Sequence, residues 1–261
     1  MTQEMPFLDH LDELRARLIR CVWVFFIGFI VCYSVSETIM GVLSKPLFDV
    51  MPPDQQKLYF TSLFENFLTH LKISGYASLF LFSPFFLYQL WAFIAPGLYD
   101  TEKKMAFPFV AVATLFFLGG AGFAYFFVFP LGFKFFINYG SASDTPILTI
   151  DSYYGTVLKL LLVFGLAFEF PVIIGLLGML GVVDAPFLRK HRGSFIIGIT
   201  VCCALFAPPD AISMLMMMAP MLLLFEVAIG FVARFGKKNI DSRHQSSKES
   251  DLHSLEGRSR P

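Results

Sequence analysis

The sequence predicts an all-α integral membrane protein with six transmembrane helices. Three observations lead to this fold class: 56% of the 261 residues are hydrophobic, only 15% are charged, and the mean hydropathy is +0.66. Soluble globular proteins carry about 25% charged residues, so water could not solvate this chain. The composition therefore excludes most soluble enzymes. The formal net charge of zero also argues against nucleic-acid binding.

Six apolar runs approach or exceed the length of roughly 18 residues that crosses a bilayer. They are Ile19–Val35, Ile73–Ala95, Met105–Phe129, Leu160–Val183, Ser194–Ala207 and Ala211–Gly230. Only helices suit these runs, because backbone groups in hydrocarbon must be paired within their own segment and no alternating strand pattern occurs. The fifth run has 14 residues and Glu226 interrupts the sixth, so both should be short for the hydrocarbon core.

The lysines and arginines predict the orientation of the chain. Fifteen of the 20 lie on the side of the two termini and five on the opposite side. Cytoplasmic loops are enriched in positive charge, so we expect both termini to be cytoplasmic. Residues 237–261 are rich in serine and charge, which predicts a disordered cytoplasmic tail after a membrane domain formed by residues 1–236.

The two loops on the opposite side should be ordered. In Ser36–Asn66, apolar residues at helical spacing predict an interfacial helix that breaks before Pro46. The loop Leu131–Tyr154 has the composition of an interfacial aromatic belt. Its aromatic residues include Phe133, Phe135, Phe136, Tyr139, Tyr153 and Tyr154.

Glu169 is the only acid deep inside a predicted span, about 14 Å along the helix from Leu160. A charge near the bilayer midplane costs at least ~2.5 kcal/mol, which favours a polar site, an ion relay or a partner contact inside the protein. Alternatively, a neutral carboxyl could satisfy the carbonyl of Ala167, because Pro171 has no amide proton to donate to it.

Two acids lie at the predicted cytoplasmic edge of the membrane. Glu102 follows the helix stop at Pro96 and Gly97, where it could be an ordinary solvated charge or could bind a cationic ligand. Glu13 lies on an amphipathic run, on the side away from its apolar stripe. It could form an i to i+4 ion pair with Arg17 or serve as a second carboxylate near Glu102.

The remaining motifs favour structure over chemistry. Structural turns are predicted at Pro46, Pro96, Pro171, Pro208, Pro209 and Asp210. His10 has no second histidine at ligand spacing, so no metal site is expected. No motif of a hydrolase, metalloprotease or phosphate-binding loop occurs. We therefore predict no enzyme activity and no cofactor.

Five ordered motifs together carry a family resemblance. They are His10–Leu18, Tyr88–Tyr99 followed by Glu102, Phe123–Leu131, Gly165–Pro171 and Pro208–Asp210. With these motifs the sequence resembles the TatC family, the multi-span subunit of the twin-arginine protein translocase, from about Phe7 to Lys238. Two positions depart from the family pattern: Ala207 stands where threonine is common, and Met214 stands where glutamine is common.

The resemblance implies a cup-shaped protein of the bacterial inner membrane that binds Arg-Arg signal peptides of folded precursors at its cytoplasmic face. The implied binding residues are Glu13, Arg15, Phe93, Tyr99 and Glu102. Glu169 would be the intramembrane acid where the single-span partner subunits TatA and TatB dock. The assembled oligomer would export its cargo with the proton-motive force.

Two rival functions are a proton-coupled small-solute transporter that uses Glu169 and an inert membrane scaffold. A transporter for a hydrophilic solute would need several polar groups near the midplane. Besides Glu169 the spans offer mainly Ser74, Ser78, Ser83, Gln89, Thr114 and Thr200. A scaffold would tolerate replacement of Glu169 by leucine without loss of function.

Overall fold

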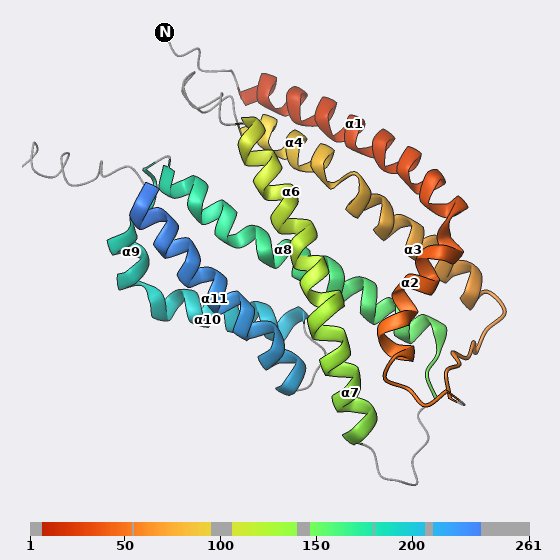
Figure 1. The fold of residues 1–261 in the computed structure, drawn as a ribbon. Coiled ribbons are helices and arrows are strands. Elements are labelled where there is room, and N and C mark those ends of the chain that lie inside the picture. The colour runs from red at the N-terminus through yellow and green to blue at the C-terminus, as the bar shows by residue number, and fades with distance from the viewer. Residues whose placement is uncertain are drawn as a thin grey trace, which may run out of the picture. The chain divides into compact units, whose positions relative to one another are not determined.

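The computed structural model describes residues 7–53, 55–94, 106–139, 147–179, 181–206 and 211–235. These residues form helices joined by short segments (Figure 1). One isolated parallel bridge joins Tyr59 and Thr149. The all-α prediction is confirmed for them. The predicted tail, residues 237–261, lies outside the described residues, as do the predicted turns at Pro96, Pro208, Pro209 and Asp210.

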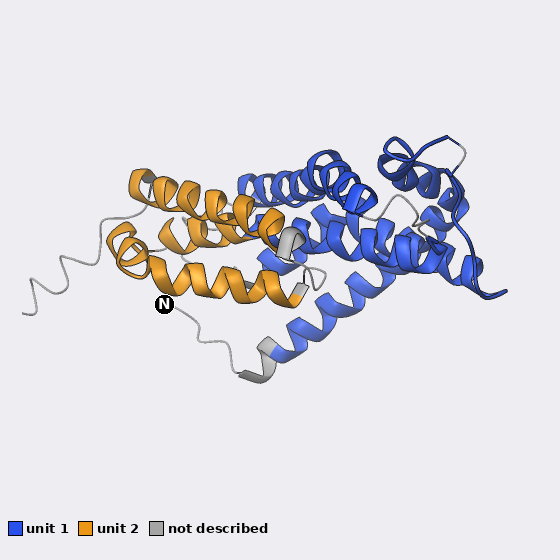
Figure 2. Cartoon of the chain, turned by 90° about the horizontal axis from the view of Figure 1, so that it is seen from below, with its two compact units in different colours: residues 1–169, 210–213 blue, residues 170–209, 214–261 orange. Residues whose placement is uncertain are grey.

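The chain divides into two compact units, coloured in Figure 2. Unit 1 contains residues 1–169 and 210–213, and unit 2 contains residues 170–209 and 214–261. Helix α8 (Ile150–Met179) contributes to both, because the division falls directly after Glu169.

Unit 1 begins with α1 (Phe7–Ser34), which packs along α3 (Glu65–Leu81). A buried hydroxyl joins the two helices, since Ser78 donates to the carbonyl of Phe25 at 2.9 Å. Between them in the sequence, α2 (Ser36–Phe48) and the following segment form a cap, residues 36–64, at the end of unit 1 opposite the start of α1 (Figure 1).

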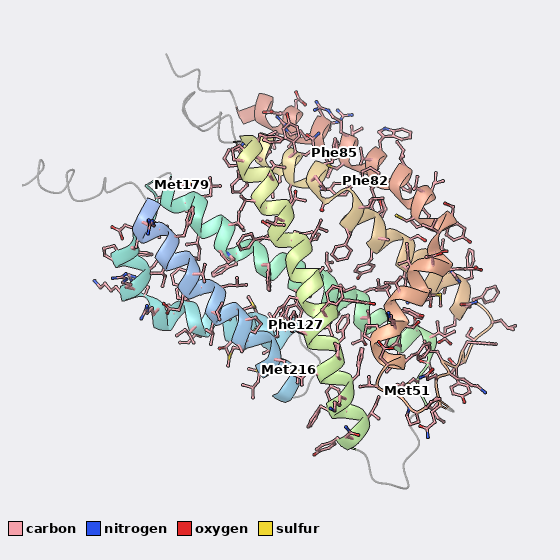
Figure 3. The ribbon with its side chains drawn as sticks, in the orientation of Figure 1. Met51, Phe82, Phe85, Phe127, Met179 and Met216 are labelled. Atoms are coloured by element: carbon pink, nitrogen blue, oxygen red, sulfur yellow. The ribbon has the colours of Figure 1, made fainter. Side chains whose placement is uncertain are left out.

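The second predicted span is bent and not straight. Helices α3 and α4 (Ser83–Ile94) meet at 58°, with Phe82 at the break and Phe85 within α4 (Figure 3). Pro84 has no amide proton for the carbonyl of Phe80. The hydroxyl of Ser83 donates to that carbonyl instead, at 2.8 Å. The bend therefore leaves no unpaired carbonyl at Phe80.

The third predicted span continues beyond its expected end at Phe129. Helix α6 (Ala106–Phe123) passes through a π-helical turn, η2 (Ala124–Val128), into α7 (Phe129–Tyr139). The apolar helical stretch is 33 residues long. Much of the predicted aromatic loop Leu131–Tyr154 is therefore helical, and its last five residues already belong to α8.

Two of the predicted proline turns are wrong. Pro46 lies inside α2 and Pro171 lies inside α8, and both helices continue past the proline. A proline removes one helical hydrogen bond but does not end a helix whose surroundings hold it in place. Pro46 and Pro171 are both buried, so packing is available to hold the two helices.

Unit 2 contains the end of α8, α9 (Ala185–Lys190), α10 (Arg192–Phe206) and α11 (Ala211–Phe235) from Met214 onward. Stacked rings of Phe195 and Phe225 join α10 to α11, with centroids 5.0 Å apart. Arg192 pairs with Glu226 at 2.7 Å, which gives the acid that interrupts the sixth apolar run a partner near the start of α10.

The number of spans agrees with the prediction only in part. Among the described residues, four helices are long and apolar enough to cross a membrane, and the bent pair α3–α4 makes a fifth candidate. Helix α10, which covers the fifth predicted run, has 15 residues and falls short of the usual length. The count of six spans and the cup shape remain predictions.

Helices α6 and α8 approach closely where each has a glycine. A Cβ on Gly120 would lie 2.5 Å from the carbonyl oxygen of Phe164, and one on Gly165 would lie 2.9 Å from the ring of Phe117. Small residues at such contacts let two backbones approach and pack in hydrocarbon. This crossing positions the part of α8 that carries Glu169, one helical turn beyond Gly165.

We predict that Gly120→Ala destabilises the protein by about 1–3 kcal/mol, because the added methyl group meets backbone that cannot rotate away. Chemical unfolding of the purified full-length protein in mild detergent measures the change. Gly119→Ala is the matched control, since a Cβ there meets nothing within 4 Å. Equal stability of the two variants would contradict the close crossing.

Candidate functional site

Glu13 lies on the part of α1 that faces α4. Arg17, one turn later, donates from Nε to Oε1 of Glu13 at 3.1 Å, and its Nη2 also pairs with Oε1. The i to i+4 ion pair considered from the sequence is thus present. The side chains are 25% exposed for Glu13 and 17% for Arg17, so the pair is largely shielded from solvent.

The same arginine reaches a second helix. Nη1 of Arg17 donates to Oε1 of Gln89 on α4 at 3.2 Å, across 72 residues of sequence. Gln89 is 6% exposed. Helices α1 and α4 pack against each other, so this hydrogen bond joins two neighbouring helices of unit 1.

The second oxygen of the Glu13 carboxylate takes no part in the ion pair. Oε2 is buried and has no hydrogen-bond partner among the described residues. An unsatisfied buried acceptor costs about 1–3 kcal/mol, and more when it is charged. The ion pair with Arg17 therefore satisfies only half of the carboxylate, and a donor that reached Oε2 would remove this cost.

The other residues of the predicted binding surface are only partly described. Arg15 is exposed on α1, and Phe93 lies near the end of α4. Tyr99 and Glu102 lie outside the described residues. The structure therefore places Glu13, Arg15 and Phe93 but does not test the expected proximity of Glu13 to Glu102.

Glu169 lies on α8 and is 7% exposed. Its Oε1 is buried without a partner in the described part of the chain. No hydrogen bond to the carbonyl of Ala167 is present there, so the structure does not support a carboxyl that satisfies the helix at Pro171. Within unit 1, Glu169 is a buried acid with hydrogen-bonding capacity to spare.

Two further buried polar atoms of unit 1 lack partners among the described residues, namely Thr114 Oγ1 on α6 and Trp91 Nε1 on α4. Helix α7 contacts the cap and α8 begins beside it, so α6 and α8 run in opposite directions. Thr114 precedes the glycine crossing on α6 and Glu169 follows it on α8. Both residues therefore lie on the side of the crossing away from the cap.

The cap is held by tyrosine hydroxyls. Val42 lacks its usual helical donor because residue 46 is proline, and the hydroxyl of Tyr125 donates to the Val42 carbonyl at 2.7 Å. Tyr153 and Tyr154 donate to the carbonyls of Leu43 and Met40 at 2.7 and 3.1 Å. These two tyrosines are buried hydrogen-bond donors and not members of an interfacial belt.

Glu65 is a structural residue that the sequence analysis missed. It is 7% exposed, and its Oε2 accepts from the amides of Thr61 and Ser62 at 2.6 and 3.2 Å. Its Oε1 accepts from the amide of Asp151, in the first turn of α8, at 2.9 Å. The spacing of Ser62 and Glu65 matches a capping box before an apolar run, a signal that could have revealed it.

We predict that Tyr125→Phe lowers the free energy of unfolding by about 0.5–1.5 kcal/mol, because the carbonyl of Val42 loses its donor. Tyr33→Phe is the matched control, since no hydrogen bond of its hydroxyl occurs among the described residues. In a Pro46→Ala background the new amide of residue 46 can donate to the carbonyl of Val42. Tyr125→Phe should then lower the free energy of unfolding by less. An equal cost in both backgrounds would refute the exchange of donors.

Comparison with known proteins identifies relatives over most of the chain. The family model for the Sec-independent protein translocase protein (TatC) matches residues 9–220. The TatC protein of Desulforapulum autotrophicum is 36% identical over 250 residues, which cover 96% of this chain and 92% of the relative. The TatC protein of Escherichia coli K12 is 36% identical over 88% of each chain.

Two solved structures are similar in fold and sequence. A crystal structure of the twin-arginine translocase receptor TatC has a TM-score of 0.75 at 36% identity and covers 85% of this chain and 97% of its own. A second, in the detergent DDM, has a TM-score of 0.77 at the same identity. The resemblance noted from the sequence motifs is confirmed by these comparisons. The chain therefore belongs to the TatC family of Sec-independent protein translocase subunits.

Proposed function

We propose that this chain is the receptor and core subunit of a twin-arginine translocase. It binds Arg-Arg signal peptides of folded precursors through Glu13 and Glu102, with Arg15, Phe93 and Tyr99 nearby. The solved relatives are themselves described as twin-arginine translocase receptors, which supports the assignment. The excess of lysine and arginine on the side of the termini favours a cytoplasmic location for this surface.

The observation that carries the proposal is the unpaired, buried Oε2 of Glu13. A guanidinium group presents several N–H donors in a planar fork, so it can satisfy this oxygen and contribute charge. The gain is large because the acceptor is already removed from water and pays little further desolvation. A second arginine of the signal peptide then has Glu102 as its acceptor.

The remainder of a signal peptide is apolar, and α1 offers matching surroundings. Leu14 and Leu18 lie on the same helical turns as Glu13 and Arg17 but on the apolar stripe of α1, where they are 42% and 61% exposed. In a bilayer such side chains contact lipid or an apolar ligand. A peptide whose arginines reach Glu13 can thus turn around α1 and place its apolar stretch against this stripe.

We further propose that Glu169 is where single-span partner subunits, TatA and TatB, dock before export driven by the proton-motive force. The support is the buried position of Glu169 and its unpaired Oε1. A polar side chain on a partner helix would supply the missing hydrogen bond, and interhelical hydrogen bonds of this kind contribute about 0.6–2 kcal/mol in membranes. Acids inside spans are rare and characteristically mark functional sites.

Glu13→Ala and Glu102→Ala should each weaken crosslinking to an Arg-Arg signal peptide by about tenfold or more, because each removes a carboxylate that accepts charged hydrogen bonds. Membrane insertion should be unchanged. Photocrosslinking in membranes, with the amount of inserted protein measured in parallel, tests both variants. Glu37→Ala removes an exposed acid on α2 and serves as the control. Unaltered crosslinking in both variants would exclude the assignment.

Glu169→Leu should abolish co-purification of single-span partners and export of a folded precursor, while crosslinking to the signal peptide persists. Leucine cannot make the hydrogen bond that docking requires. Glu169→Gln retains hydrogen-bonding capacity without a titratable proton, so it should retain partner co-purification. If Glu169→Leu exports cargo at the wild-type rate, Glu169 has no role in docking.

A further inference from the structure

We propose that Arg17 and Gln89 are positioning residues that orient the Glu13 carboxylate toward an incoming guanidinium group. This inference rests on the proposed function of Glu13 in signal-peptide binding. Neither Arg17 nor Gln89 touches the peptide in this scheme. Their role is to fix which oxygen of Glu13 is occupied and which one remains free.

The geometry divides the two oxygens of Glu13 unequally. Arg17 directs both Nε and Nη2 to Oε1, while Oε2 has no partner in the described part of the chain. An arginine can pair with a carboxylate through two parallel hydrogen bonds to both oxygens, but this one uses a single oxygen. The internal arginine thereby leaves the acceptor positions of Oε2 unused and available to a second guanidinium that displaces the groups covering this oxygen.

Gln89 explains why Arg17 holds this arrangement. An isolated i to i+4 pair on a helix contributes only about 0.2–0.5 kcal/mol, and both side chains remain free to rotate. Here Nη1 is bound to the amide oxygen of Gln89, which is buried on a different helix. Since the guanidinium is planar, fixing Nη1 on Gln89 also fixes the direction in which Nε and Nη2 point.

The orientation of Oε2 matters more for arginine than for lysine. A guanidinium binds as a planar fork whose hydrogen bonds depend on angle, whereas an ammonium behaves as a point charge with rotatable donors. A variant in which the Glu13 carboxylate is free to rotate should therefore bind an Arg-Arg peptide much more weakly, while its affinity for a Lys-Lys peptide changes little. The ratio of the two affinities reports positioning and is insensitive to a uniform loss of folded protein.

The test uses purified full-length protein in detergent and two synthetic fluorescent signal peptides, identical except for Arg-Arg or Lys-Lys before the apolar stretch. Gln89→Met removes the hydrogen-bond acceptor and keeps a side chain of similar length. It should lower the affinity for the Arg-Arg peptide about tenfold and the affinity for the Lys-Lys peptide less than about twofold. Arg17→Lys should do the same. The double variant should bind the Arg-Arg peptide no more weakly than either single variant does, because the two residues act as one unit.

Gln89→Glu keeps an acceptor oxygen at the same place along the side chain and should restore the wild-type ratio to within about twofold. Leu90→Met is the matched control on α4, since it places the same new side chain next to Gln89 at a position that is 58% exposed. It should leave both affinities unchanged.

The outcomes separate this inference from the proposed function. If Glu13→Ala binds both peptides as the wild type does, the proposed role of Glu13 fails. If Glu13→Ala loses the Arg-Arg peptide while Gln89→Met and Arg17→Lys retain it, the role of Glu13 stands and the positioning role is overturned. Equal weakening of both peptides by Gln89→Met, or no restoration by Gln89→Glu, also overturns it.

Discussion

The structure depends on one constraint: a polar group away from water must find a partner inside the protein. At Pro84 and Pro46 in unit 1 a helical carbonyl loses its amide donor, and a side-chain hydroxyl takes the place of the missing amide. The hydroxyl of Ser83 donates to the carbonyl of Phe80 at the bend before α4, and the hydroxyl of Tyr125 donates to the carbonyl of Val42 in the cap. Because each carbonyl regains a partner, the chain can bend or carry a proline at low cost.

Buried side-chain atoms that have no hydrogen-bond partner are exceptions to this constraint. Among the described residues, four buried side-chain atoms have no partner, and they belong to Glu13, Trp91, Thr114 and Glu169. All four residues lie in unit 1. Two of these residues are acids. Their unpaired oxygens cost the most free energy to bury, so a hydrogen bond to them contributes the most. The proposed binding and docking roles use these two acids.

The two sequence interpretations of Glu13 are compatible. From spacing, Glu13 could pair with Arg17 or remain available as a ligand-binding carboxylate. The structure shows the pair, but the pair occupies only Oε1. A carboxylate has two oxygens and several acceptor positions, so one internal arginine does not exhaust it. The internal pair therefore leaves one oxygen of the carboxylate without a partner, and this is the oxygen that the proposed binding uses.

The amino-acid sequence by itself determined the membrane class, the helical fold, the family, and the positions of Glu13 and Glu169 at unusual places in apolar surroundings. These follow from composition, local periodicity and short motifs, which need no knowledge of contacts between helices. Only the tertiary structure decided that Gln89 anchors Arg17, that Tyr125 compensates for Pro46, and that Oε2 of Glu13 stays unpaired. Such pairings depend on how each helix is rotated and in what register it meets its neighbour. Residues far apart in sequence set that arrangement jointly, so no local pattern encodes it.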